Sequence, residues 1–386
     1  MQFKMKITSI HKLLGSQLTM LMCSMGLMFI LNSCEDKPNG NDKPNFKTTL
    51  VDPASIFDKK LGPVPILPTD NPLTVEGIAL GRMLFYDPIL SIDSTVSCGS
   101  CHKQQFAFAD GPVALSRGVF GLVTNRNTPP LFNLAYNKKF FWDARQNTLR
   151  ELVFEPIQAH NEMAMTLPML DRRLRRSSMY KDAFLKAFNA EPNVFDMSLA
   201  MEQFLLSIVS YQSRFNDFFP GKFSKLTDEE GKGALLFNAL VDFDLDGNVT
   251  GADCFHCHGD NKAQIQDPTF GGIANNGLDL VFTDKGYGGI TGRFQDMGTF
   301  KTPSLLNIEL TGPYMHDGRF KTLDEVIDHY SEGVKFNSPN LNPMMSHEGK
   351  HLNLKPEQKA ALKAFLLSMT DTAFINNPKY SNPFKK

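Results

Sequence analysis

Two short cysteine motifs carry the most specific chemistry in this chain, Cys98-Gly-Ser-Cys101-His102 and Cys254-Phe-His-Cys257-His258. In each, two thiols have the spacing that attaches a haem covalently, and the histidine that follows is placed to be the proximal ligand of the iron. A thioredoxin-like redox pair and half of a zinc site are the alternatives for a single motif. Two copies that use every cysteine outside the N-terminal region favour haem. The sequence therefore predicts two covalently bound haem c groups.

The other two cysteines, Cys23 and Cys34, lie in a segment with the features of an export signal. Lysines precede an apolar stretch at 13–31, and Ser33-Cys34 ends a sequence of lipobox form. A transmembrane helix is the alternative, because the stretch is nearly long enough to span a bilayer. The polar residues directly after Cys34 favour the lipoprotein. We expect a lipoprotein signal peptide at 1–33, a flexible tether at 34–50, and a periplasmic protein anchored through Cys34 to a membrane, most simply the outer membrane.

Length and composition set broad limits on the fold and on the partners. A chain of 386 residues suggests two domains, and one cysteine motif falls in each half. We place the boundary near Phe219-Pro220-Gly221. A net charge of −1 argues against nucleic acid as a partner. The 32 phenylalanines predict apolar walls around the haems, and against them the single tryptophan, Trp142, stands out.

Apolar residues recur at helical spacing in several segments, which predicts a mainly α-helical fold. A capping box at Thr227–Glu230 starts one helix, and Pro356 opens the last one. The Gly- and Pro-rich stretches 111–133 and 268–315 are expected to be loops packed over haem. No internal repeat is visible beyond the two cysteine motifs. Helices are predicted at 170–188, at 198–215, after Glu230 through Leu240, and after Pro356 through Met369.

Further motifs follow each cysteine motif in a distinctive order, and in this order and spacing they resemble the bacterial di-haem cytochrome c peroxidases and the related MauG enzymes. The resemblance runs from about residue 52 to 370. It implies two cytochrome c-like domains, one at 51–220 with the peroxidatic haem and one at 221–375 with the electron-transfer haem. The motifs are Arg126-Asn127-Thr128-Pro129, Phe141-Trp142-Asp143-Ala144-Arg145, Glu162-Met163, Thr302-Pro303-Ser304-Leu305 and Pro313-Tyr314-Met315-His316-Asp317-Gly318.

At the first haem, the resemblance implies that Glu162 is the distal acid–base carboxylate. A carboxyl group in an apolar pocket has a raised pKa, which suits proton transfer near neutral pH. Many family members block this haem with a histidine, but none occurs here between His102 and His160, and the aligned region lies near Gly118. We therefore expect an open first haem that needs no reductive activation. Where the family commonly has a glutamine in this pocket, the chain has Leu152.

Two further roles at the first haem are expected. His160 is a candidate second distal group, and a surface histidine is the alternative. The resemblance places Trp142 between the haems, where its indole would relay an electron.

At the second haem, the resemblance implies that Tyr330 is the second axial ligand of the iron, opposite His258. It stands at the position where the peroxidases carry the methionine that is the sixth iron ligand, and MauG enzymes also have a tyrosine there. A phenolate stabilises ferric iron, whereas a thioether favours ferrous iron. A tyrosine packed in the core is the alternative. The competing ligands are Met315, Met344, Met345 and His329.

Two calcium sites are predicted. The first is implied by the resemblance, with the Asn127 side chain and the backbone oxygens of Thr311 and Pro313 as ligands, since hard oxygen ligands suit calcium. The second follows from a loop with aspartates at positions 1, 3, 5 and 12 and a glycine at 6, like an EF-hand. An acidic solvated turn is its alternative. The four aspartates are Asp242, Asp244, Asp246 and Asp253.

Together these features predict a di-haem cytochrome c peroxidase, an oxidoreductase that reduces hydrogen peroxide to water. The electrons would come from a small periplasmic cytochrome c or cupredoxin. The alternative is a MauG-like oxidase that uses oxidising equivalents from peroxide on a protein or organic substrate. A plain electron carrier is a third hypothesis, and Glu162 argues against it. Family members often form homodimers, so the resemblance offers a homodimer as one arrangement of this chain.

Overall fold

The computed structural model describes residues 46–218, 225–259 and 272–385, and the predicted signal peptide, the lipidation site at Cys34 and the boundary at Phe219 lie outside them. The described residues are mainly helical, with one two-stranded antiparallel sheet. No helix in this part of the chain combines the length and apolar character needed to cross a membrane. The helices are α1 Val75–Tyr86, α2 Cys98–Cys101, α3 Leu149–Leu152, α4 Phe154–Gln158, α5 Leu167–Arg176, α6 Ser178–Phe188, α7 Val194–Ser207, α8 Arg214–Phe218, α9 Asp228–Asn238, α10 Phe255–His258, α11 Gly288–Thr291, α12 Leu323–Asp328, α13 Pro356–Leu367 and α14 Thr372–Ile375, and the strands are β1 Ile273–Ala274 and β2 Phe300–Lys301.

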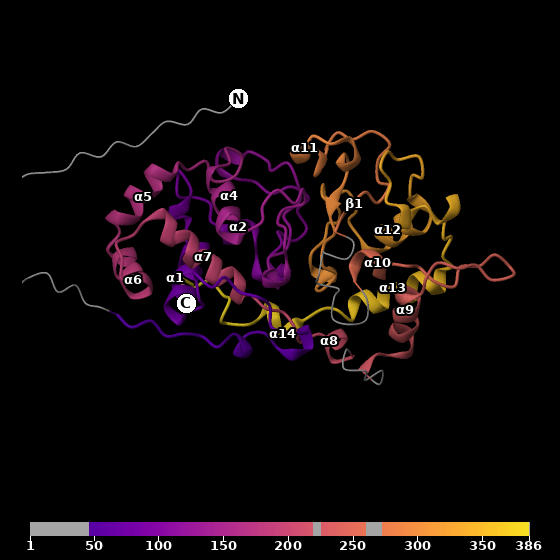
Figure 1. Cartoon of the computed structure of the whole chain (residues 1–386), viewed down its shortest axis with the longest axis horizontal. Helices are drawn as coiled ribbons and strands as arrows, with labels where there is room; N and C mark the ends of the chain where they lie inside the picture. Colours follow the sequence, from indigo (N-terminus) through magenta and orange to yellow (C-terminus); the bar gives the residue numbers. More distant parts are fainter. Residues whose placement is uncertain (1–45, 219–224, 260–271, 386) are drawn as a thin grey trace, which may run out of the picture. The chain divides into compact units, whose positions relative to one another are not determined.

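Two helix pairs organise the fold, α1 with α7 and α9 with α13 (Figure 1). In the first pair, a Cβ atom on Gly81 would lie 2.0 Å from the carbonyl oxygen of Ala200. In the second pair, a Cβ on Gly233 would lie 2.0 Å from the carbonyl oxygen of Ala361. Both glycines therefore bring the two helix backbones into direct contact, which any side chain would prevent.

The same two pairs also repeat an aromatic contact beside each glycine. The rings of Phe85 and Phe204 meet edge to face at 5.3 Å, and so do those of Phe237 and Phe365, also at 5.3 Å. The structure thus contains an internal repeat, with a glycine and a phenylalanine at matching places in each pair. This repeat was not recognised in the sequence, where it consists of a glycine followed four residues later by a phenylalanine, Gly81 and Phe85 in α1 and Gly233 and Phe237 in α9.

Most of the predicted helices are present, with differences at their ends. The capping box of Thr227 and Glu230 starts α9, and Pro356 is the first residue of α13. The predicted helix at 198–215 is wrong at its end, because α7 stops at Ser207. The chain then extends, and the Asp371 carboxylate accepts hydrogen bonds from the backbone N–H groups of Tyr211 and Gln212. A side chain distant in the sequence therefore replaces the helical hydrogen bonds of this segment.

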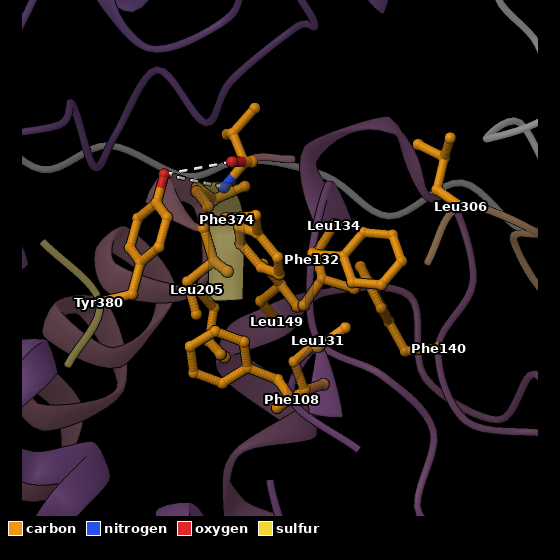
Figure 2. Close-up of a cluster of buried hydrophobic side chains, with 14 of the residues drawn as sticks. Phe108, Leu131, Phe132, Leu134, Phe140, Leu149, Leu205, Leu306, Phe374 and Tyr380 are labelled. Carbon is orange, nitrogen blue, oxygen red and sulfur yellow. Dashed lines mark hydrogen bonds between the residues drawn. The ribbon is translucent and has the colours of Figure 1, made fainter. Parts of the chain in front are cut away.

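The C-terminal segment packs into the core around the first cysteine motif. Figure 2 shows Phe374 and Tyr380 beside Phe108, and the Tyr380 hydroxyl hydrogen-bonds to the backbone N–H and carbonyl of Val209. The ring centroids of Phe108 and Phe374 are 5.8 Å apart. These contacts hold Phe108, whose backbone is part of the site described below. Residues beyond 371 thus complete the core of the N-terminal half.

We predict opposite effects of adding one methyl group at two glycines of α9. Gly233→Ala should lower the free energy of unfolding by about 1–3 kcal/mol, since its Cβ collides with the Ala361 carbonyl. Gly231→Ala, with nothing within 4 Å of its Cβ, should raise it by about 0.5–1 kcal/mol through helix propensity. Urea unfolding followed by circular dichroism measures both. Equal effects of the two substitutions would contradict the close helix contact.

Candidate functional site

Both cysteine motifs line one large cavity of about 1060 Å³. Ligand pockets in proteins usually hold about 300–1,000 Å³, so this cavity is at the upper limit of that range. Its wall includes Cys98, Cys101 and His102 of the first motif and Cys254, Cys257 and His258 of the second. The fold thus brings together two motifs from opposite halves of the chain.

The histidines of the two motifs are held in the same way. The Nδ1 atom of His102 is 2.7 Å from the carbonyl oxygen of Phe108, and that of His258 is 3.1 Å from the carbonyl oxygen of Pro303. Burial lowers the pKa of each ring to about 4, so both are neutral at pH 7. A neutral ring that donates from Nδ1 leaves the lone pair of Nε2 for a metal, which is the arrangement of a metal-ligating histidine.

The thiols have properties that fit covalent haem attachment better than the alternatives. All four are free of disulfide bonds. Burial raises the pKa of Cys98 to about 12 and that of Cys101 to about 11, whereas a redox-active pair needs a lowered thiol pKa. Among the described residues, no group of three or more His, Cys, Asp or Glu side chains is arranged to hold a metal ion.

Glu162 lies on the cavity wall on the side of the first motif. It is partly buried, and burial raises the pKa of its carboxyl group, while Arg145 opposes the shift and Glu155 adds to it. Its backbone is fixed by hydrogen bonds from its N–H to Ala159 and from the Val119 N–H to its carbonyl. The structure therefore provides a carboxyl group with a raised pKa that faces the same space as His102.

The other sequence-predicted residues near the first motif fall into two sets. Gly118 and Leu152 line the cavity. His160 does not line it, but is exposed and lies with its ring 6.1 Å from that of Phe120. Of the two hypotheses for His160, the surface histidine is the one that the geometry supports.

Trp142 is held at the cavity wall by hydrogen bonds from two directions. Its indole Nε1 donates to the carbonyl oxygen of Asn127 at 2.9 Å, and its own carbonyl accepts from the Lys301 N–H at 2.7 Å. The second bond joins it to β2, in the half of the chain that contains the second motif. Trp142 is thus hydrogen-bonded to Asn127 in the N-terminal half of the chain and to Lys301 in the C-terminal half.

An ion-pair network connects the same segments. Arg126 donates to both carboxylate oxygens of Asp284, at 2.7 and 2.9 Å, and also pairs with Asp143. Arg145 pairs with Asp143 on its other side and with Glu155. Bidentate guanidinium–carboxylate pairs are directional, so this network fixes the relative position of the loops that carry Asp143 and Asp284.

Tyr330 lies on the cavity wall near the second motif, in a π-helical turn at His329–Gly333. Such turns often occur at functional sites. Burial raises the pKa of Tyr330 to about 12, and the Asn276 amide nitrogen lies 3.2 Å from its hydroxyl oxygen and 3.6 Å from the Met315 sulfur.

The competing candidates for the sixth ligand differ in their exposure to the cavity. Met315, Met344 and Met345 also line it. His329 does not, because its Nε2 is 3.1 Å from the Asn276 carbonyl oxygen. Tyr330 and the three methionines therefore remain candidates for the sixth iron ligand, whereas His329 does not line the cavity.

The predicted calcium ligands have different outcomes. Asn127, Thr311 and Pro313 all border the cavity. In the acidic loop, Asp244 accepts hydrogen bonds from the backbone N–H groups of Asp246 and Asn248, and Asp253 pairs with His256. The structure does not bring Asp242, Asp244, Asp246 and Asp253 together as a set of metal ligands in this part of the chain.

Many residues of the cavity wall were not predicted from the sequence, among them Asp284, Asn276 and Lys301. Asn276 stands in the Asn-Asn-Gly sequence 275–277, which reads as a turn and gives no sign of its contact with Tyr330. Lys301 directly precedes the Thr302-Pro303 motif, and this position is the sequence feature that could have indicated a place on the cavity wall.

Comparisons with known proteins agree with this geometry. The family model for the di-haem cytochrome c peroxidase matches residues 75–224. The chain is 33% identical to the methylamine utilization protein MauG of Methylorubrum extorquens, over 81% of this chain and 83% of that protein. It is 31% identical to the cytochrome-c peroxidase IdrP1 of a Pseudomonas species, over 82% and 87% of the two chains. The crystal structure of a MauG-like protein associated with microbial copper homeostasis superposes with a TM-score of 0.75 at 31% identity, covering 85% of this chain and 99% of that one.

We predict that Gly118 sets the position of the Glu162 carboxyl group. A Cβ at residue 118 would lie 2.3 Å from the carbonyl oxygens of Asn161 and Glu162, so Gly118→Ala should displace this turn. Peroxide consumption should fall at least tenfold while both haems stay attached. Gly121→Ala is the control, because no atom lies within 4 Å of its Cβ, although its positive φ makes a modest stability loss expected. Full activity of Gly118→Ala would contradict the assignment.

Proposed function

Because the chain belongs to the di-haem cytochrome c peroxidase and MauG family, we propose that it reduces hydrogen peroxide to water with electrons from a small redox protein. The observation that carries this proposal is Glu162, a carboxyl group with a raised pKa on the same cavity wall as His102. A plain electron carrier has no need of such a group. An active peroxidase needs one to move a proton during cleavage of the O–O bond.

The cavity residues fit two haem c groups, one attached through Cys98 and Cys101 with His102 as iron ligand, the other through Cys254 and Cys257 with His258. When bound, these haems would supply an iron that takes up peroxide at the first site and an electron store at the second. The division into domains at 51–220 and 221–375 is part of the proposal, and the repeated helix pairs support it. Export to the periplasm with a lipid anchor at Cys34 is a further part, supported by the sequence of the leader.

Glu162 would act as both base and acid. Its carboxylate takes a proton from hydrogen peroxide and returns it to the departing oxygen, which leaves as water. The apolar surroundings supplied by Leu152 and Met163 keep water from competing for this proton. Gly118 packs against the backbone of Asn161 and Glu162 and has no side chain that could bind iron, which supports a first site that is open at all times.

Trp142 would carry electrons between the two sites. Its indole N–H donates to the carbonyl oxygen of Asn127, and its backbone carbonyl accepts from the N–H of Lys301. These two hydrogen bonds hold the indole ring in one orientation. The calcium ion proposed at Asn127, Thr311 and Pro313 would hold the same region. The ion would bind the side chain of Asn127, whose carbonyl oxygen accepts the hydrogen bond from the Trp142 indole.

A second candidate function is a MauG-like oxidase that acts on a protein or organic substrate. The observation that favours it is Tyr330, whose hydroxyl oxygen lies on the cavity wall next to the Asn276 amide. A phenolate ligand would favour ferric iron and so the retention of oxidising equivalents. Peroxide turnover with a reduced cytochrome as donor distinguishes the two. Rapid donor oxidation supports the peroxidase, and stoichiometric peroxide consumption without donor oxidation supports the oxidase.

Replacing Glu162 by glutamine should lower the rate of peroxide consumption by about 10²–10⁴-fold, the usual contribution of a general acid–base group. In the unsubstituted protein the rate should fall as the pH drops through the raised pKa of Glu162, because the protonated carboxyl cannot accept a proton. In Glu162→Gln the remaining rate should not follow this profile. Stopped-flow measurement over a pH series tests both points, with the exposed Glu151→Gln as control. An unchanged profile in Glu162→Gln would remove Glu162 from the mechanism.

Tyr330→Phe should change the visible and electron paramagnetic resonance spectra of the second haem, because the substitution removes the ligating oxygen. Asn276→Leu should shift the same signals less, since it removes only the hydrogen bond to that oxygen. Tyr287→Phe is a matched control, as Tyr287 is not among the described residues that line the cavity. If neither Tyr330 nor Asn276 affects the spectra, a methionine is the sixth ligand.

A further inference from the structure

Lys301 has a cationic side chain and lines the cavity that Trp142 and both cysteine motifs share. It is the last residue of β2, and its backbone N–H donates to the Trp142 carbonyl at 2.7 Å. Two residues later, the Pro303 carbonyl receives the hydrogen bond that orients His258. Lys301 therefore lies two residues before Pro303, whose carbonyl oxygen contacts the Nδ1 atom of His258.

This ammonium group has no counter-ion within the described part of the chain. Its one hydrogen bond there is to the Thr302 carbonyl, at a long 3.4 Å, and no Asp or Glu side chain forms an ion pair with it. The nearest charged network does not supply one, because Asp143 and Asp284 are both engaged by Arg126. Burial lowers the pKa of Lys301 to about 8, so the group is still mainly cationic at neutral pH.

A partly buried cation without a partner is unfavourable, and a bound anionic group would complete the pair. Each haem carries two propionate carboxylates, which are anionic at neutral pH. We propose that the Lys301 ammonium group binds a propionate carboxylate of the haem attached at Cys254 and Cys257. This inference rests on the proposed attachment of that haem.

The assignment to the second haem follows from the backbone. Lys301 and Pro303 belong to one short segment of the cavity wall, and Pro303 holds the iron ligand of that haem. A positive charge beside a haem favours its ferrous form, which carries one positive charge less. The ion pair therefore tunes the electron store, and the same residue's N–H positions the carbonyl of Trp142.

The test is a redox titration of the haem-loaded protein, followed by the absorption of each haem. Lys301→Met should lower the midpoint potential of the second haem, with a tenfold or greater change in its reduction equilibrium, equivalent to about 59 mV for one electron. Lys301→Arg, which keeps the charge, should shift it by less than a third of that amount. Lys321→Met is the control, since it removes an exposed lysine from the same half of the chain and should leave both potentials unchanged.

Three results would overturn the proposal: no change in either potential, an equal change in Lys301→Met and Lys301→Arg, or a change confined to the first haem. If Lys301→Met accumulates without two haems, Lys301→Gln, which is neutral and polar, replaces it in the titration. Haem content, determined by staining for covalent haem, and peroxide turnover of the unsubstituted protein are measured separately. Loss of the proposed function would appear in those two measurements, whereas failure of this inference would appear only in the potentials.

Discussion

Direct contact between helix backbones at Gly81 and Gly233 is the constraint on which the site depends. Each glycine lets a helix lie against a carbonyl of its partner, and the neighbouring phenylalanines fill the remaining space. The consequences reach both cysteine motifs. Phe85, on α1, has its ring 6.5 Å from that of His102, and the Phe237 carbonyl, at the end of α9, accepts the N–H of Cys254. Each helix crossing thus positions the motif that follows it in the sequence.

The two ends of the cavity differ in their side chains, although the helix pairs beside them are equivalent. Near the first motif the cavity wall includes Gly118, Leu152 and Glu162. At the second, Tyr330 and Met315 occupy the wall, and the Asn276 amide contacts both. Since the histidines of the two motifs are held alike, the proposed difference in chemistry rests on the other residues of the cavity wall. An open face next to a carboxyl group suits peroxide, whereas a crowded face suits electron storage.

The sequence predicted the parts of this arrangement that local patterns encode. Cysteine spacing located both motifs, the capping box located α9, and the order of motifs located Glu162 and Trp142. It did not predict contacts between distant segments. The end of α7 depends on Asp371, the core beside His102 depends on Tyr380, and the wall near the second motif depends on Asn276. These pairings carry no local signature, because each partner is an ordinary residue until the fold brings it to its neighbour.

The charges of the cavity wall show what the protein itself balances and what it leaves to a bound group. Arg126, Asp143, Arg145 and Asp284 neutralise one another through the ion pairs that join the two halves. Glu162 and Lys301 have no ion pair with any described residue, and burial shifts the pKa of each toward its neutral form. A fold that pairs four charges so closely could have paired these two also. Both residues line the cavity, in keeping with the two proposals: a carboxyl group that exchanges a proton with peroxide, and an ammonium group that binds a propionate.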